Sequence, residues 1–267
     1  MKLTLIRTDR ETGKESFSIL EAETLIEKIK KENKAAHVSA LRHLIPMLQG
    51  TDNHYLNIDK LPRIYPAVEY ARTKDGEHRV KIYNGLVQIE VNHLAGITEV
   101  EQIKQQASLL PQTFAAFCGS SGRSVKIWVL FALPDGSFPK HESEMALFHA
   151  HAYRLAVSCY QPLLPYSITL KEPSLNQSCR MTLDEQPYYN PAAIPFCLEI
   201  KYHAAITWDQ FIYDCACISR SSFFHLAFTG RSECLVFAVF GFQISGVQFI
   251  NAVIAILLIE QCQVVND

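Results

Sequence analysis

The segment Asn84–His93, NGLVQIEVNH, is the most strand-like part of the chain. Its polar side chains Gln88, Glu90 and Asn92 alternate with apolar ones. Successive side chains of a strand point to opposite faces, so the pattern predicts a strand over residues 81–94. Oxygen and amide groups on one face could converge on a hard cation. An ordinary solvated sheet face is the other interpretation, and periodicity alone favours it.

A second strand-rich region follows around a turn of small residues. Residues 114–118 predict a short strand, and residues 124–133 alternate between apolar and polar side chains as a second strand would. The turn Gly119-Ser120-Ser121-Gly122 lies between them. The N–H groups of such a turn can bind an anion. Arg123 and Lys126 supply charge for phosphates, and Trp128 an aromatic face for a base. The spacing differs from a Walker A motif, and a solvent turn with a structural Trp is an equally good interpretation.

Helical periodicity flanks these strands. Residues 20–29 follow a possible capping box of Ser18 and Glu21, and three further helices are expected over residues 35–48, 98–110 and 142–160. Residues 1–7 alternate and predict a short edge strand. Interleaved strands and helices predict a layered α/β (α+β) domain. The polar stretch of residues 171–185 is either a surface loop or a functional one.

Composition narrows the class of protein without choosing a function. The chain has 267 residues and a net charge of −2, which neither suggests nucleic acid nor excludes a local basic groove. Its eight cysteines include no C-x-x-C pair, so reduced thiols are expected rather than disulfides or a zinc site. The first residues lack the apolar run of a secretion signal, and we expect a cytoplasmic protein.

Several short motifs occur in a fixed order along the chain. They are Leu61-Pro62, residues 84–90, residues 121–126, and Ser178-Cys179-Arg180 ahead of Asp184 and Tyr189-Asn190-Pro191. Together, over roughly residues 15–197, they resemble the VirE-type N-terminal domain family of mobile genetic elements, which is placed in the archaeo-eukaryotic primase superfamily. The resemblance implies a primase-polymerase-like domain over residues 1–199, with a central, mostly antiparallel sheet flanked by helices.

The resemblance also implies roles for individual residues. Glu90 and Asn92 match the catalytic positions that hold Mg²⁺ or Mn²⁺ for nucleotidyl transfer. Nucleotide-binding positions are matched by Ser121, Gly122, Arg123, Lys126 and Arg180, and Trp128 would contact nucleic acid. A third acidic position is occupied by Lys171, with Glu172 and the candidate catalytic residue Asp184 as imperfect substitutes.

Because Asn92 and Lys171 depart from the pattern of the family, three hypotheses for the function remain. The first is a primase-polymerase-like enzyme that acts on a nucleoside triphosphate and single-stranded DNA, beside a helicase-type partner domain outside this chain. The second is a catalytically silent nucleotide- or nucleic-acid-binding module, which is favoured by Asn92 and Lys171, because Mg²⁺ affinity depends on charged oxygen ligands. The third is a truncated remnant without activity.

The chain changes character beyond Phe196. Residues 234–259 contain no charged side chain and exceed the roughly 20 apolar residues that span a bilayer. Residues 200–267 are therefore a membrane anchor, a buried hydrophobic segment, or an end foreign to the family, recombined or out of frame. The third interpretation is favoured because the resemblance stops where the composition shifts. A membrane association is expected only if the anchor is real.

Overall fold

The computed structural model describes residues 1–9, 12–31, 37–47, 61–72 and 78–198. The chain divides into two compact units, Met1–Tyr202 and His203–Asp267. The hydrophobic segment and the three interpretations of it lie outside the described residues. Among the residues that the structure does describe, no helix has the length and apolar character needed to cross a membrane.

The larger sheet is built around one central strand. Strand β8 (Val125–Ala132) lies antiparallel between β6 (Leu86–Val91) and β7 (Thr113–Cys118). Strand β10 (Tyr188–Tyr189) extends the sheet antiparallel to β7, and β11 (Phe196–Cys197) pairs in parallel with the end of β8. The mixed α/β class with antiparallel sheets is thereby confirmed.

A second sheet and a hairpin complete the β-structure. Strands β2 (Glu15–Glu21), β1 (Lys2–Thr8), β3 (Arg63–Tyr65) and β9 (Cys179–Arg180) form an antiparallel sheet in that order. Strands β4 (Val68–Arg72) and β5 (His78–Tyr83) pair with each other. The strand expected at the N-terminus is confirmed as β1, but its expected place at the edge of a sheet is wrong, because β1 has a partner on both sides. The capping box is also wrong, because Ser18 lies within β2.

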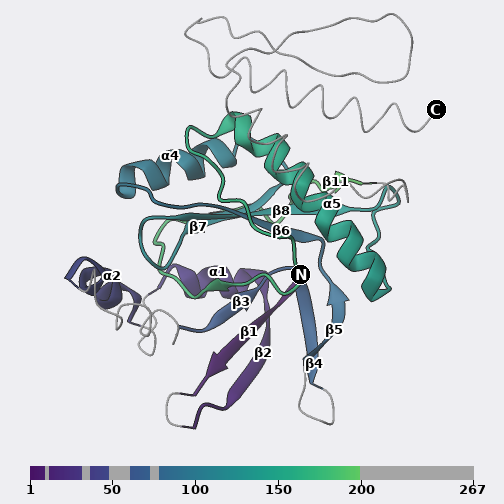
Figure 1. The fold of residues 1–267 in the computed structure, drawn as a ribbon, viewed down its shortest axis with the longest axis horizontal. Coiled ribbons are helices and arrows are strands. Elements are labelled where there is room, and N and C mark those ends of the chain that lie inside the picture. Colours follow the sequence, from purple (N-terminus) through teal and green to yellow (C-terminus); the bar gives the residue numbers. More distant parts are fainter. Residues whose placement is uncertain (10–11, 32–36, 48–60, 73–77, 199–267) are drawn as a thin grey trace, which may run out of the picture. The chain divides into compact units, whose positions relative to one another are not determined.

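The helices occupy both sides of the larger sheet (Figure 1). Helices α4 (Ile97–Ala107) and α5 (Glu142–Tyr160) lie on one side, and a single 3-10 turn, η1 (Gln161–Leu163), follows α5. Helix α1 (Ala22–Ile29) lies on the other side, with β1 and β3. Helix α2 (Val38–Met47) stands at the periphery in that view. The sheet is therefore covered on both faces, which explains why all six residues of β6 are buried.

The strand expected over residues 81–94 is interrupted at Asn84-Gly85. Gly85 has a φ of +69°, and a Cβ there would lie 2.2 Å from the Phe131 carbonyl oxygen, so only glycine fits. The Asn84 side chain donates hydrogen bonds to the carbonyl oxygens of Lys2 and Pro66, at 2.7 and 3.1 Å. The chain thus leaves the β4–β5 hairpin and enters the larger sheet within two residues.

Candidate functional site

A buried carboxylate on β6 is bracketed by two ammonium groups. Glu90 is only 3% exposed, and it faces Lys126 across the antiparallel β6–β8 pair. The Lys126 ammonium donates to Glu90 Oε2, and Lys171 Nζ lies 2.5 Å from Oε1. Asn92 Nδ2 also donates to Oε1, at 3.0 Å, and to Thr169 Oγ1, at 3.1 Å. We call Glu90, Asn92, Lys126 and Lys171 the Glu90 cluster.

The two ammonium groups decide the protonation state of Glu90. Burial by itself would raise the pKa of this carboxyl group, because a charge loses its hydration. The attraction and hydrogen bonds of Lys126 and Lys171 outweigh that penalty and lower the pKa to about 2. Glu90 is therefore ionised at neutral pH, as an internal ion pair.

Lys171 reaches the cluster from a segment that has no regular secondary structure. Its position is fixed on both sides: Thr169 N–H donates to the Glu90 carbonyl oxygen at 2.8 Å, and Lys171 N–H donates to the hydroxyl of Tyr153 on α5 at 2.9 Å. Ile168 forms an isolated antiparallel bridge with Val91 at the end of β6. The lysine is therefore anchored through its backbone, while its side chain is 42% exposed.

These residues do not fit the divalent cation that the resemblance implies. Each Glu90 oxygen already accepts from an ammonium group, and the Asn92 amide presents its N–H₂ to the carboxylate. A further cation would be repelled by both lysines. Within the described part of the chain, no three His, Cys, Asp or Glu side chains gather in a way that could hold a metal ion.

The small-residue turn lies directly before β8 and is pinned from one side by helix α2. Arg42 donates to the carbonyl oxygens of Gly119, Ser120 and Leu183, at 2.9, 3.2 and 2.6 Å, and to Thr182 Oγ1 at 3.1 Å. Gly122 has a φ of +76°, and its N–H donates to Gly119 O at 3.0 Å. Arg42 therefore ties the turn to helix α2, with the Gly119 and Ser120 carbonyl groups directed at its guanidinium.

The other expected nucleotide-binding residues divide between surface and structural positions. Arg123 is exposed, and its carbonyl oxygen accepts from Leu94 N–H at 3.1 Å, which ties the turn to the end of β6. Ser121 Oγ accepts from the Arg123 N–H at 3.2 Å. Arg180 is half-buried on β9 and donates to the Leu61 carbonyl oxygen at 3.4 Å.

Trp128 is in a different environment from the one expected for a nucleic-acid contact. Its side chain is fully buried, its ring packs edge-on against Phe117 with centroids 4.8 Å apart, and its Nε1 donates to Gln88 Oε1 at 3.0 Å. Stacking a base on this ring would require the core to open. Of the two interpretations of the region, the structural Trp is the one that this placement matches.

Asp184 belongs to a second, separate ion pair. Its carboxylate accepts from Lys104 Nζ at 3.0 and 2.9 Å and from Cys118 N–H at 2.7 Å. Lys104 also contacts Glu101 and the Gln186 carbonyl oxygen, at 2.8 and 2.9 Å. The bonds of Asp184 join α4, the end of β7 and the segment before β10, which is a structural arrangement. Within the part of the chain that the structure describes, Asp184 shares no hydrogen-bonding or ion-pair partner with Glu90.

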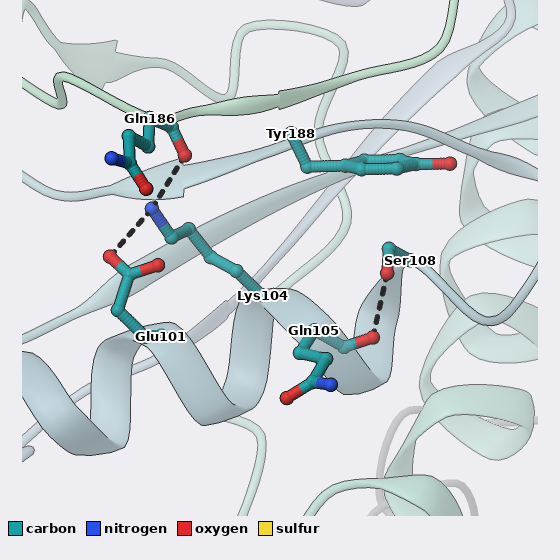
Figure 2. Close-up of a pocket in the computed structure, with 6 residues that line it drawn as sticks. All are labelled: Glu101, Lys104, Gln105, Ser108, Gln186 and Tyr188. Carbon is teal, nitrogen blue, oxygen red and sulfur yellow. Dashed lines mark hydrogen bonds and ion pairs between the residues drawn. The ribbon is translucent and has the colours of Figure 1, made fainter.

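A pocket of about 350 Å³ is lined by Lys104 of this second ion pair and by Glu101, Gln105, Ser108, Gln186 and Tyr188 (Figure 2). Figure 2 shows Lys104 turned toward Glu101 and the Gln186 backbone, and Ser108 bonded to the Gln105 carbonyl oxygen. The ammonium has three N–H bonds, and Asp184, Glu101 and Gln186 account for all of them. Among the described residues that line the pocket, no cationic donor is therefore left free for a ligand, in contrast to the Glu90 cluster.

Part of the chain is similar to a known protein family. Residues 57–189 match the family model of the BT4734-like, N-terminal domain. No curated protein and no solved structure matches the chain. The matched region contains the Glu90 cluster, the small-residue turn and Asp184, whereas Arg42 and strands β1 and β2 precede it.

Lys104 and Arg42 were not predicted from the sequence as site residues. Lys171 was noted only because it stands where the resemblance expects an acidic residue. Lys104 occupies one position of the apolar stripe of α4, between Val100 and Ala107, and is buried with them. A lysine within such a stripe is a usable signal for a buried partner. Arg42 gives no comparable signal, because its acceptors are backbone carbonyl oxygens remote in the sequence.

Proposed function

We propose that the described domain is a primase-polymerase-like module of the VirE type that binds the phosphates of a nucleoside triphosphate and of single-stranded DNA without transferring nucleotides. The module would serve a replication protein of the kind that mobile elements carry. The observation that supports the proposal is the pair of lysines on Glu90. The three motifs that contribute Glu90, Lys126 and Lys171 lie apart in the sequence and meet at one place in the fold.

The charge of the Glu90 cluster favours the binding of an anion. One carboxylate faces two ammonium groups, so the Glu90 cluster carries a net positive charge. Exposed Arg123 lies at the end of the turn that leads into β8. Arginine and lysine side chains bind phosphate oxygens by charge-assisted hydrogen bonds. A phosphate at the rim of the sheet could accept from Lys171 and Arg123 while Lys126 keeps the carboxylate neutralised.

The same arrangement argues against nucleotidyl transfer. That reaction uses divalent cations to activate the attacking oxygen and to neutralise the leaving pyrophosphate. Such cations need carboxylate ligands. In this domain the available carboxylate is neutralised internally, and the neighbouring position is an amide.

Binding can be measured by fluorescence anisotropy with the full-length chain, labelled single-stranded DNA and a labelled triphosphate. Arg123→Ala should weaken binding of both ligands and reduce the slope of log affinity against log salt concentration. Arg79→Ala on β5 is the matched control, because Arg79 is also an exposed arginine and lies in the β4–β5 hairpin. Equal losses in the two variants, or no binding by the wild type, would refute the proposal.

Primer extension with Mg²⁺ or Mn²⁺ tests the silent character of the module. We expect no product from the wild-type chain. A product that disappears in Glu90→Gln would establish the metal-dependent transferase that the resemblance implies, and the binding-only function would then be wrong.

A further inference from the structure

Resting on the proposed function, we infer that Lys171 is a tethered cation that takes the place of a divalent metal at Glu90, so that phosphate binding at this site is independent of metal ions. The ammonium group neutralises the carboxylate on one side and presents positive charge to the phosphate on the other. The ligand class is a nucleoside triphosphate free of its usual Mg²⁺ or the phosphodiester backbone of DNA.

The position of the ammonium group supports this inference. Lys171 Nζ lies 2.5 Å from Glu90 Oε1, on the oxygen to which the Asn92 amide also donates. The resemblance implies that a cation is held by Glu90 on β6 and by Asn92, directly after that strand. The ammonium group lies on the Glu90 oxygen to which Asn92 donates. Lys126 donates to the other carboxylate oxygen, so both oxygens of Glu90 already face an ammonium group where a metal would bind.

The anchoring of Lys171 distinguishes it from an ordinary surface lysine. A lysine in a surface ion pair contributes little, because holding its long side chain costs conformational entropy. Here the backbone N–H is bonded to Tyr153, whose side chain is fully buried, and Thr169 is bonded to the backbone of Glu90. The backbone from which the Lys171 side chain starts is therefore held against the end of β6 and helix α5.

The remaining exposure gives the ammonium group room for a second partner. An ammonium group has three N–H donors, and Glu90 uses one. With the side chain 42% exposed, other donors can face solvent or an external oxygen. Lys126 is more deeply buried than Lys171 and suits the internal role. The two lysines thus have different roles: Lys126 neutralises Glu90, and Lys171 bridges Glu90 to the ligand.

The first experiment titrates the full-length chain with a fluorescent triphosphate in EDTA and again in Mg²⁺. We expect dissociation constants within about twofold of each other, and a loss of roughly tenfold for Lys171→Gln in both buffers. Lys140→Gln, at an exposed position before α5, is the control and should change neither value. Binding that requires Mg²⁺ would overturn the tethered cation and leave the proposed binding function intact. Absence of binding in both buffers would overturn both.

The second experiment needs no nucleotide. Mn²⁺ binding, followed by electron paramagnetic resonance, should be undetectable at this site in the wild type and should appear in Lys171→Asp, because the substitution removes the competing ammonium group and adds a second carboxylate beside Glu90. Lys140→Asp adds the same charge elsewhere and should bind no Mn²⁺. Mn²⁺ binding by the wild type that is lost in Glu90→Gln would contradict the inference.

Discussion

Asp184 and Lys104 illustrate, at the scale of single residues, how this domain keeps charges inside. Their side chains are 5% and 4% exposed. The lysine reaches both carboxylate oxygens, and the aspartate also accepts from the backbone N–H groups of Cys118 and Gln186. A buried ion pair costs desolvation, and it is tolerated when further hydrogen bonds satisfy the remaining donors and acceptors, as they are here.

Removing one member of this pair should destabilise the domain strongly. We expect Lys104→Met to lower the free energy of unfolding by about 3–5 kcal/mol, because it leaves the Asp184 carboxylate buried without its counter-ion. The double variant Lys104→Met/Asp184→Asn should recover part of that loss, since an amide oxygen can still accept from Cys118 N–H. Urea unfolding measures both values.

The control for this prediction is Lys31→Met. Lys31 is 78% exposed and lies 4.0 Å from Glu27, so its loss should cost less than about 1 kcal/mol. If Lys104→Met costs no more than Lys31→Met, the buried pair does not stabilise the fold in the way described.

At the scale of helices and strands, local patterns predicted the elements that carry a clear period. Helix α5 begins and ends where the pattern of residues 142–160 places it, and Val100, Ile103 and Ala107 of α4 are buried as expected. Strand β8 also follows from alternation, and β7 from the short strand expected over residues 114–118. The break at Gly85 was missed, because the close approach of the Phe131 carbonyl oxygen is a contact between distant residues. Strand β2 was missed because it depends on pairing with β1.

The candidate site, like the strands and helices, was predictable from the sequence only where a local pattern was present. Alternation correctly put Lys126 and Trp128 on one face of β8, but it carried no information on whether that face is covered. The face is covered by α1, β1 and β3, so Trp128 became core. Lys171 lies in an irregular segment, and its approach to Glu90 is set by bonds to Glu90 and Tyr153. No local pattern encodes such a contact.

Helix α2 should control the rigidity of the small-residue turn. In Arg42→Lys an ammonium group replaces the planar guanidinium, and it cannot reach the same set of acceptors. We expect the free energy of opening of the turn to fall by about 1–3 kcal/mol, so that the amides of residues 119–123 exchange hydrogen faster. Triphosphate binding should also become weaker. Hydrogen-exchange mass spectrometry measures the first effect.

The neighbouring exposed residue of α2 supplies the control. His43→Ala changes the same helix without touching the turn, and should leave exchange at residues 119–123 unchanged. Unchanged protection of the turn in Arg42→Lys would mean that the turn is held by its own hydrogen bonds, such as that from Gly122 N–H to Gly119 O.

At the scale of the whole domain, two buried groups make stability depend on pH in different ranges. His149 on α5 is 1% exposed, and burial lowers its pKa to about 4, from an ordinary 6.5. The folded state therefore resists protonation, and stability falls as the pH drops from 6.5 to about 4. Glu90, with a pKa lowered to about 2 from 4.5, loses its contribution between those two values. Acid unfolding should begin with the histidine.

His149→Gln should flatten the first part of this profile. Between pH 6.5 and pH 4 the imidazole of His149 is protonated in the unfolded chain but stays neutral in the folded one. The free energy of unfolding of the wild type should therefore fall by about 3 kcal/mol over this range through His149. Glutamine cannot titrate, and it can still bond the Tyr83 hydroxyl, which lies 3.1 Å from His149 Nδ1. His141→Gln, at the exposed start of α5, should keep the wild-type slope. Denaturant unfolding at a series of pH values measures the slopes. Parallel profiles for the wild type and His149→Gln would place the acid sensitivity elsewhere, with His151, whose pKa is also lowered by burial, as the next group to vary.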